Sequence, residues 1–368
     1  MGKPQLPSLL RPITTYDPLH QVGEGTYGKV FCAVDTLKRK AAGSSAADGQ
    51  LVALKRIKVE NEEEGFPITA IREIKILRML SHENIVRLEQ VVAGGGGEGE
   101  WSDPDSIFLA FEYLEYDLAG VLKKARDAHR RVFSVAQVKS LARQLLSAVA
   151  FCHKAHVLHR DLKLANLLLS KTGYLKLADF GLARHFTAAL SSYTVKVITL
   201  WYRPPELLLG LDAYGPAIDC WSAGCIIAEL INGEALMPGQ NEVDQLALIW
   251  SVVGTPKGAV KEELAACPWW SVMGPKGTKS SALADRIRGG DGTAVDVVSG
   301  LLNLSPTERS KADAALDADY FWSDPMPIPP GKESDWVPSL AFVGKDAHEF
   351  TVRKAREAMG AQPKRIIQ

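Results

Sequence analysis

Two short strings near the middle of the chain place carboxylate and amide oxygens close together. His159-Arg160-Asp161-Leu-Lys163-Leu-Ala-Asn166 sets an aspartate ahead of an asparagine, and Asp179-Phe180-Gly181 follows thirteen residues beyond that asparagine. Oxygen atoms of this kind are the ligands that the hard cation Mg²⁺ prefers. Either string alone is compatible with a surface loop, but the two at this spacing favour chemistry on a metal-bound phosphate.

A glycine-rich string near the start of the chain is a second candidate for phosphate contact. In Gly23-Glu-Gly25-Thr-Tyr-Gly28-Lys-Val30 the glycines would let backbone approach a phosphate with no Cβ in the way. A dinucleotide site would need a helix next, but residues 29–34 read as a strand. A P-loop would need Ser or Thr where Val30 stands, to hold magnesium. The remaining interpretation is a β-hairpin that covers nucleotide phosphates.

Composition narrows the class of protein. The 368 residues suggest about two domains, and 46% hydrophobic residues are ordinary for a protein with a core. Equal numbers of basic and acidic residues, 43 each, give no global sign of nucleic acid or a membrane surface as partner. The five cysteines are scattered with no CxxC pair, which favours neither disulfides nor zinc. We find no signal-peptide core and no apolar run long enough to span a bilayer.

Those motifs must be positioned by elements that the pattern predicts along the chain. Residues 16–34, 51–57, 85–92 and 107–112 are predicted strands, whereas 40–50 and 94–105 are Gly-rich and predicted to be loops. Pro67 is predicted to open a helix with four apolar positions on one face: Ile68, Ile71, Ile74 and Leu77. The remainder is predicted to be helical, at 134–155, 219–232, 243–253 and 292–303. A polar tail is expected after 325–330, with a short helix at 348–359.

Taken together and in this order, the glycine string, the Asp161 string, the Asp179 string and Pro204-Pro205-Glu206 resemble the protein kinases. The resemblance implies an α+β fold of two lobes, a small β-rich lobe with one main helix and a larger helical lobe. The predicted divisions are an N-terminal extension at 1–15, the small lobe at 16–113, the large lobe at 114–325 and a C-terminal tail at 326–368.

The resemblance also implies catalytic roles with ATP and Mg²⁺ as cofactors. Asp161 would accept the proton of the substrate hydroxyl, with Lys163 and Thr199 beside it as in Ser/Thr kinases. Asn166 and Asp179 would be the metal ligands. A pseudokinase scaffold is the binding-protein alternative, but it would need a lost catalytic residue and none is lost.

Lys55, in Val52-Ala-Leu-Lys55, would bind the α- and β-phosphates and pair with Glu73. An isolated lysine would otherwise be a surface residue, and Glu73 an exposed helix glutamate. Asp117 is expected at the ribose edge, Phe111 as gatekeeper and 112–114 as the hinge. The expected nucleotide-binding residues are Val22, Gly23, Gly25, Gly28, Val30, Ala53, Lys55, Phe111, Glu112, Tyr113, Leu114 and Asp117.

The string Pro67-Ile-Thr-Ala-Ile-Arg72-Glu73 resembles the cyclin-binding helix of cyclin-dependent kinases. Residues 59–66, 113–120 and 194–206 resemble the transcription-elongation branch, which includes the plant C-type kinases. This implies a cyclin partner on the 67–73 helix, Ser/Thr-Pro substrates such as the RNA polymerase II C-terminal repeats, and a nuclear location, with the cytoplasm also open. A cell-cycle kinase is the nearer alternative. Leu164 departs from the family, where proline or a small residue is common.

Three arginines from separate elements, Arg72, Arg160 and Arg184, are expected to converge, and converging guanidiniums need an anion between them. Phosphorylation of Thr194 would supply one. The alternative is that each arginine pairs with a nearby carboxylate. Inhibitory phosphorylation, which would crowd the ATP phosphates, is predicted at two residues of the glycine string, Thr26 and Tyr27.

Structural roles are implied for two further sites in the large lobe and for the tail. Glu206 and Arg309 resemble a buried pair that ties the activation segment to the large lobe, and Asp219 resembles a brace for the catalytic loop. The tail resembles those that fold back towards the nucleotide, with His348 or Glu349 near Asp117. Phe350 would anchor on the large lobe. A loose chain end is the alternative.

Overall fold

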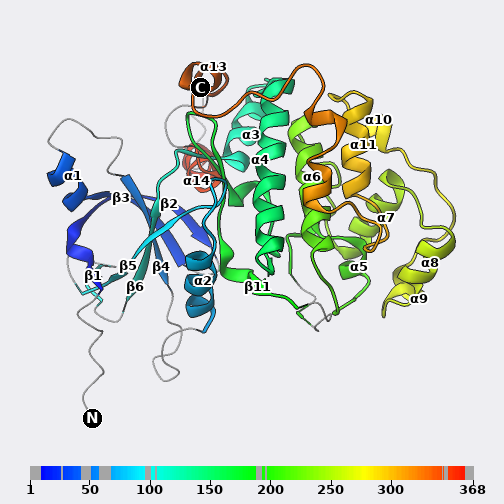
Figure 1. The fold of residues 1–368 in the computed structure, drawn as a ribbon, viewed down its shortest axis with the longest axis horizontal. Coiled ribbons are helices and arrows are strands. Elements are labelled where there is room, and N and C mark those ends of the chain that lie inside the picture. Colours follow the sequence, from blue (N-terminus) through cyan, green and yellow to red (C-terminus); the bar gives the residue numbers. More distant parts are fainter. Residues whose placement is uncertain are drawn as a thin grey trace, which may run out of the picture.

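The computed structural model describes residues 10–25, 28–42, 51–57, 68–95, 101–103, 106–187, 193–194, 197–341, 343 and 347–360. They form a small lobe built on a sheet and a larger lobe of helices (Figure 1). This arrangement confirms the predicted α+β, two-lobed fold. No helix in the described ranges is long and apolar enough to cross a membrane.

The small lobe holds a six-stranded sheet with strand order β1-β5-β6-β4-β3-β2. Its strands are β1 Arg11–Pro12, β2 Tyr16–Gly25, β3 Gly28–Asp35, β4 Leu51–Ile57, β5 Leu88–Ala93 and β6 Ile107–Glu112. The glycine string forms the β2–β3 hairpin, with Gly25 opposite Gly28. Because Lys55 on β4 pairs with Val30 on β3, the lysine lies beneath this hairpin.

Three features of the small lobe differ from the sequence prediction. Helix α1, Thr36–Ala42, was not predicted and runs into the segment expected to be a loop. Strand β5 begins at Leu88 because Ile85 instead bridges to Leu177 of the large lobe. Trp101, in the predicted loop insertion, stacks on Phe108 of the sheet with ring centroids 5.0 Å apart.

Helix α2, Ile68–Met79, buries only part of the predicted apolar face, with Leu77 inside. Ala70, Glu73 and neighbours face inward, whereas Ile68 is 72% exposed and Ile71 is 39% exposed. The helix turns the carboxylate of Glu73 towards Lys55, and this rotation leaves the two isoleucines outside. Pro67, predicted to open the helix, lies outside the described residues.

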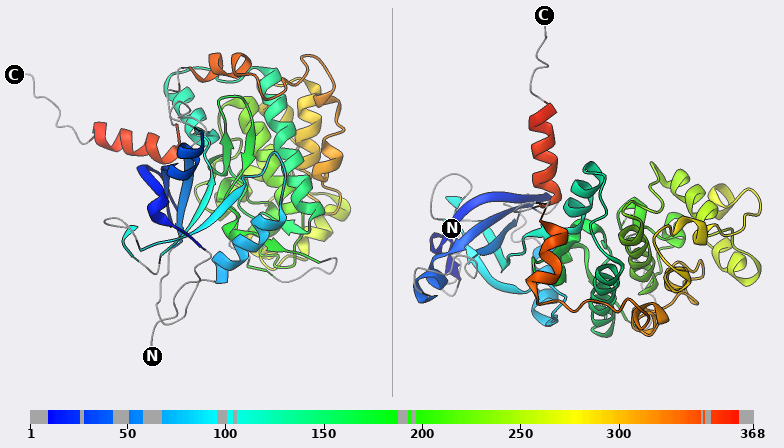
Figure 2. Two further views of the ribbon diagram at one scale, coloured as in Figure 1. Left: turned by 60° about the vertical axis from the view of Figure 1, so that its left-hand side comes forward. Right: turned by 90° about the horizontal axis from the view of Figure 1, so that it is seen from above.

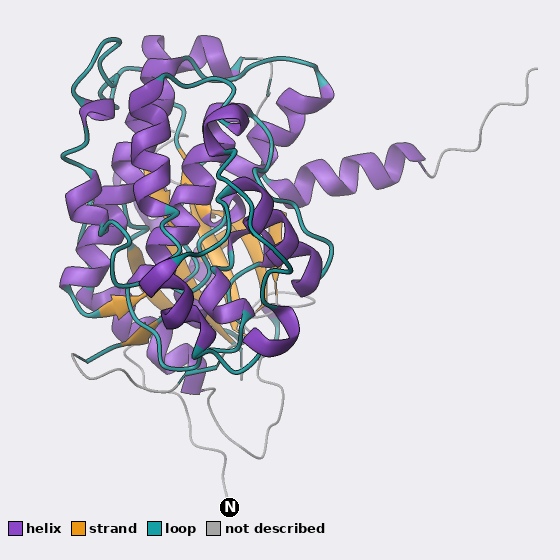
Figure 3. Cartoon of the chain, turned by 90° about the vertical axis from the view of Figure 1, so that its right-hand side faces the viewer, coloured by secondary structure: helices purple, strands orange, loops and turns teal. Residues whose placement is uncertain are grey.

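Most of the large lobe is helical (Figure 3). It is organised around two helices that pack against each other, α4 Val135–Lys154 and α6 Ala217–Asn232 (Figure 1). Ser134 caps α4 and exchanges hydrogen bonds with Gln137, so the chain enters this helix where predicted. Helix α6 is buried over nearly its whole length, as its apolar sequence predicted. The other helices here are α3 Leu118–Asp127, α5 Pro205–Leu208, α7 Glu242–Val252, α8 Gly258–Ala265, α9 Trp270–Met273, α10 Leu283–Arg286, α11 Gly292–Leu301 and α12 Ala312–Ala315.

Short strands of the large lobe hold the Asp161 string and the Asp179 string. One sheet has the order β10-β9-β7 and a second pairs β11 with β8. These strands are β7 Tyr116–Asp117, β8 Val157–Leu158, β9 Leu167–Leu169, β10 Leu175–Leu177 and β11 Arg184–His185. The Asp161 string lies between β8 and β9, and the Asp179 string lies between β10 and β11, so the sheets bring the two strings to the same edge.

The globular part does not end at residues 325–330, contrary to the prediction. Helix α13, Glu333–Leu340, buries Trp336 completely, and the indole covers Gly173, where a Cβ would lie 2.0 Å from the ring. Helix α14, Glu349–Gly360, confirms the predicted tail helix and extends away from the body (Figure 2). Residues 331–341 therefore belong to the packed structure because an aromatic anchor holds them.

Candidate active site

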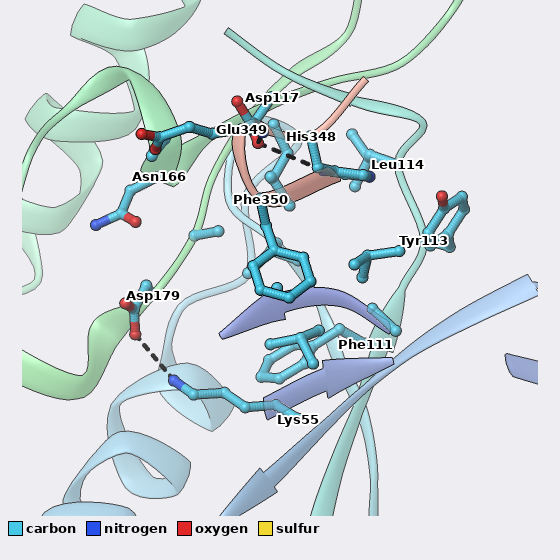
Figure 4. Close-up of a pocket in the computed structure, with 18 of the residues that line it drawn as sticks. Lys55, Phe111, Tyr113, Leu114, Asp117, Asn166, Asp179, His348, Glu349 and Phe350 are labelled. Atoms are coloured by element: carbon cyan, nitrogen blue, oxygen red, sulfur yellow. Dashed lines mark hydrogen bonds and ion pairs between the residues drawn. The ribbon is translucent and has the colours of Figure 1, made fainter. Parts of the chain in front are cut away.

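Lys55 is the centre of a buried cluster of charges between the lobes. Its Nζ lies 2.8 Å from Oε1 of Glu73. The same Nζ lies 2.9 Å from Oδ1 of Asp179 (Figure 4). Burial would lower the pKa of Lys55, but the charges of Asp179 and Glu73 outweigh burial and raise this pKa above its ordinary value. Burial likewise opposes ionisation of Asp179, yet Lys55 holds the pKa of that carboxyl below its usual value. Lys55 and Asp179 are therefore both ionised near neutral pH.

Asp161 is surrounded by donors that fix both oxygens of its carboxylate. Nζ of Lys163 lies 2.8 Å from Oδ2, and Oγ1 of Thr199 lies 3.3 Å from Oδ1. Nδ2 of Asn166 donates to the backbone carbonyl and to Oδ2 of Asp161. The residues that sequence analysis grouped around this aspartate thus meet in one place.

Asp219, in the first turn of α6, binds the backbone of the loop that carries Asp161. Its carboxylate accepts the N–H groups of His159 and Arg160, each at 2.9 Å. Nε2 of His153 lies 3.1 Å from the same carboxylate. Burial lowers the pKa of His153, but the hydrogen bond to Asp219 outweighs it and raises that pKa to about 9. A protonated histidine therefore supports the brace, a contact that sequence analysis did not foresee.

Asn166 and Asp179 suit Mg²⁺ as far as their chemistry goes. Because Nδ2 of Asn166 faces Asp161, its carbonyl oxygen is turned the other way, towards the cleft that Asp179 also lines. Among the described residues no three His, Cys, Asp or Glu side chains gather into a metal site. A magnesium ion held by Asn166 and Asp179 would therefore need phosphate oxygens as further ligands, which is how this ion is usually bound with nucleotides.

A cleft of about 310 Å³ lies under the β2–β3 hairpin. With one exception, all the expected nucleotide-binding residues line it, from Val22 to Asp117. The exception is Gly25, which lies in the hairpin at the end of β2. Sequence analysis missed several apolar lining residues because they carry no motif of their own: Val86, Ala165, Leu168 and Ala178.

The hinge end of the cleft is covered by the tail (Figure 4). Asp117 accepts the N–H of Gly120 at 2.6 Å and the N–H of Glu349 at 2.7 Å, and Nδ1 of His348 lies 3.6 Å from it. A Cβ on Gly120 would lie 2.5 Å from the carbonyl of Ala347, so only glycine leaves room for this contact. The tail therefore docks where the resemblance implied, beside Asp117.

Phe350 is placed differently from its prediction. The residue lines the cleft and is 8% exposed, and its ring points inward between Phe111 and the hinge (Figure 4). The prediction that this residue anchors on the large lobe is wrong, because the first turn of α14 directs the side chain into the space between the lobes. Phe350 therefore narrows the cleft at its hinge end.

The three arginines that were predicted to converge, Arg72, Arg160 and Arg184, differ in the contacts that they make. Nε and Nη1 of Arg160 donate to the carbonyl of Leu182 and to the hydroxyl of Tyr214, so this arginine does not pair with a carboxylate. Arg184 donates to the carbonyl of Ala183, and Arg72 lies half-buried on α2. Thr194 is exposed. Thr26 and Tyr27 lie outside the described residues.

Two further contacts shape the segment that follows Thr194. Arg309 and Glu206 form a buried bidentate pair at 2.7 and 3.0 Å, as the resemblance implied. Ile198 has φ 65°, in the left-handed region. Its carbonyl accepts Nε and Nη2 of Arg203 at 3.2 and 3.0 Å. Sequence analysis missed this turned carbonyl, because nothing in the residue types marks it.

Comparison with known proteins places this geometry in a family. The sequence profile of the protein kinase domain matches residues 16–321. Cyclin-dependent kinase C-1 of Oryza sativa subsp. japonica is 42% identical over 358 residues, covering 95% of this chain and 65% of that protein. CTD kinase subunit alpha of Schizosaccharomyces pombe is 42% identical over 321 residues, covering 87% and 50%. Cyclin-dependent kinase 9 of Danio rerio is 43% identical over 325 residues, covering 85% and 82%. The chain thus spans less than two thirds of the rice relative's length.

Proposed function

Because this chain belongs to the protein kinase family, we propose that it is a cyclin-dependent Ser/Thr kinase that transfers the γ-phosphate of ATP to proteins. One observation carries the proposal. The ion pairs of Lys55 and the hydrogen-bonded group around Asp161 face a single cleft, although their residues come from separate parts of the chain. No residue expected for phosphoryl transfer is replaced, which argues against a pseudokinase scaffold.

In the proposed reaction the chain acts by position and charge. Lys55 holds the phosphates and is itself held by Glu73. Asn166 and Asp179 hold Mg²⁺, which neutralises charge on the phosphates when bound. Asp161 orients the substrate hydroxyl and accepts its proton, and Lys163, 2.8 Å from that carboxylate, lies near the developing charge.

We assign the preference for Ser/Thr-Pro substrates to Ile198 and Arg203. A residue following the phosphoacceptor would normally offer its N–H to a nearby carbonyl. The carbonyl of Ile198 is taken by Arg203, so an ordinary N–H placed there would lose its partner. Proline has no N–H and escapes this loss. The geometry thus supports the substrate class that the resemblance implied.

The cyclin is proposed to bind the outer face of α2. Ile68, Ile71 and Met79 are exposed there, at 72%, 39% and 55%. Exposed apolar residues gathered on one helix usually mark a partner surface. A cyclin on this face would hold α2 where Glu73 reaches Lys55. We expect Ile68→Asp to abolish association with the cyclin while leaving the unfolding temperature of the chain unchanged.

The finer role follows from the names of the relatives, one of which is a CTD kinase subunit. We propose the RNA polymerase II C-terminal repeats as substrate, in transcription elongation, with the chain working in the nucleus. Direct binding of nucleic acid or membrane forms no part of the proposal. Activation is proposed to follow phosphorylation of Thr194, whose phosphate would be bound by Arg72, Arg160 and Arg184.

The test uses the tagged chain isolated together with the cyclin that co-purifies. We expect transfer of phosphate from ATP, dependent on Mg²⁺, to a Ser-Pro peptide and far less to the matched Ser-Ala peptide. Mass spectrometry of the active complex should find phosphate on Thr194. Absence of transfer to every Ser or Thr peptide would contradict the proposed function, and equal rates on both peptides would contradict the role of Ile198.

A further inference from the structure

Tyr214 lies between the catalytic loop and the segment that contains Thr194. The residue precedes α6 and is 3% exposed. Its hydroxyl accepts a hydrogen bond from Nη1 of Arg160 at 2.9 Å and donates one to the backbone carbonyl of Thr194 at 2.8 Å. One buried hydroxyl therefore joins the arginine next to Asp161 to the residue that we propose is phosphorylated.

The guanidinium of Arg160 is oriented from more than one side. Its Nε donates to the carbonyl of Leu182 at 2.8 Å, in addition to the bond with Tyr214. The ring of Tyr193 lies 5.7 Å from Cζ of Arg160 and packs on the ring of Tyr214 at 5.2 Å. A guanidinium has five N–H donors, so these two bonds leave three to meet an anion. The Arg160 side chain is thus held in place while three of its N–H donors remain to bind an anion.

The backbone of Arg160 connects this contact to the reacting groups. The residue has φ 65°, its N–H donates to Asp219 and its carbonyl accepts the N–H of Ile198 at 3.1 Å. A left-handed conformation at a residue other than glycine persists only where its surroundings hold it. Asp161 follows directly in the chain. A shift of the Arg160 side chain would therefore reach both the proposed base and the residue that selects proline.

We propose that Tyr214 is a positioning residue that holds Arg160 and Thr194 in register while Thr194 carries no phosphate. The proposal rests on the proposed function and deepens its regulation. A phosphate on Thr194 would place a charge of about −2 and three acceptor oxygens beside the same arginine. This stronger bridge would replace the one made by the Tyr214 hydroxyl. Tyr214 should therefore matter most to the unphosphorylated enzyme and set its basal activity.

The test is Tyr214→Phe, which keeps the ring and its packing on Tyr193 but removes the hydroxyl. The complex with its co-purifying cyclin is assayed after phosphatase treatment and again with Thr194 phosphorylated. We expect kcat of the dephosphorylated form to fall about tenfold, the size of one lost hydrogen bond to a charged group. The phosphorylated form should change by less than about twofold, with KM for ATP unaltered in both.

Three outcomes would overturn the proposal. Equal loss of kcat in both forms would show that Tyr214 supports the fold in general. No loss in either form would show that its hydroxyl positions nothing. A larger loss in the phosphorylated form would place Tyr214 among the groups that bind the phosphate.

Tyr193→Phe is the matched control, because its hydroxyl donates to the carbonyl of His185 and not to Arg160. In Tyr193→Phe the ratio of kcat between the dephosphorylated and the phosphorylated form should be the same as in the wild type. Amide exchange supplies a readout without catalysis. The N–H groups of Tyr193 and Ile198 are bonded to the carbonyls of Asp212 and Arg160, and Tyr214→Phe should speed exchange at both. Unchanged exchange would contradict the proposal. Faster exchange in a chain that phosphorylates no peptide would contradict only the proposed function.

Discussion

The two ends of the nucleotide cleft are built in different ways. At the catalytic end, Lys55 is fixed by two carboxylates and Asp161 by three neighbouring side chains. At the hinge end, Asp117 binds a backbone N–H of the tail, from Glu349, 232 positions along the chain. Buried charges within the two lobes thus fix the catalytic end of the cleft. The hinge end is covered by the C-terminal tail.

This difference separates the residues proposed to transfer phosphate from those that control entry of the nucleotide. Charged pairs in a buried site hold their geometry because removing either partner leaves an uncompensated charge. The tail is held at the hinge by a backbone N–H and a histidine on the single carboxylate of Asp117, and by one aromatic ring. We expect a nucleotide to displace these contacts at lower free-energy cost than the ion pairs of Lys55. Helix α14 packs on α3 and β2 at its first turns and then extends away from the body (Figure 2). We therefore expect changes at the catalytic end to alter kcat and changes at the hinge end to alter nucleotide affinity.

The largest effect is expected from Asp161→Asn. Loss of the proton acceptor should reduce kcat by about 10²–10⁴, while the dissociation constant for ATP stays nearly unchanged because Lys55 and the hinge remain in place. Single-turnover transfer and direct titration with ATP measure the two quantities. Asp317→Asn, at an exposed position of the large lobe, is the matched control. A normal rate in the Asp161 variant would remove the assigned role.

A second prediction concerns the brace beneath the catalytic loop and its dependence on pH. The pKa of His153 is about 9 against an ordinary value of 6.5. The stabilisation is therefore fully present below pH 6.5 and is lost as pH rises through about 9. A shift of this size corresponds to about 3 kcal/mol, at about 1.36 kcal/mol per unit.

Thermal unfolding of the wild type and of His153→Gln measures this contribution. The difference in unfolding temperature should be largest near pH 6, should shrink as pH rises from 6.5 to about 9, and should be absent above that value. A difference that does not depend on pH would mean that the charge on His153 plays no part. Activity should fall over the same alkaline range, since Asp219 would lose support for the loop that carries Asp161.

The smallest effect is expected at the hinge end. Phe350→Ala removes the ring from the cleft, so the dissociation constant for ATP should fall by about tenfold, which corresponds to the low end of the roughly 1.5–3 kcal/mol for burying one Phe side chain. Gly120→Ala should have a similar effect, because its Cβ would meet the carbonyl of Ala347 at 2.5 Å and undock the tail. Neither change should alter kcat.

Gly292→Ala is the control for the glycine substitution, since a Cβ there meets nothing within 4 Å. Isothermal titration with ATP and with the same nucleotide plus Mg²⁺ would measure the affinities. A rise in the dissociation constant in the two hinge-end variants would show that the tail assists nucleotide binding, and the contrast between the two ends would then need a different explanation.

The sequence by itself determined much of the catalytic end and the regular elements behind it. Lys55, Asp161, Asn166 and Asp179 were expected at the site from motifs that resemble those of the protein kinases, and the structure brings them together in two pairs, Lys55 with Asp179 and Asn166 with Asp161. Helix α4 was predicted at 134–155 because Ser134 and Gln137 form a local cap and the apolar period is clear. These signals lie within a few residues of one another, so they can be read without the fold.

Other features were decided only by tertiary structure. Rotation of α2 towards Lys55 decided which positions of its apolar face are exposed, Ile68 and Ile71, and which is buried, Leu77. The bonds of Tyr214 to Arg160 and Thr194 join residues that carry no shared motif. The tail segment that leads to Phe350 passes so close to Gly120 that a Cβ there would lie 2.5 Å from the carbonyl of Ala347. Contacts of this kind join residues that meet only when the lobes pack, and local pattern contains no record of which surfaces will meet.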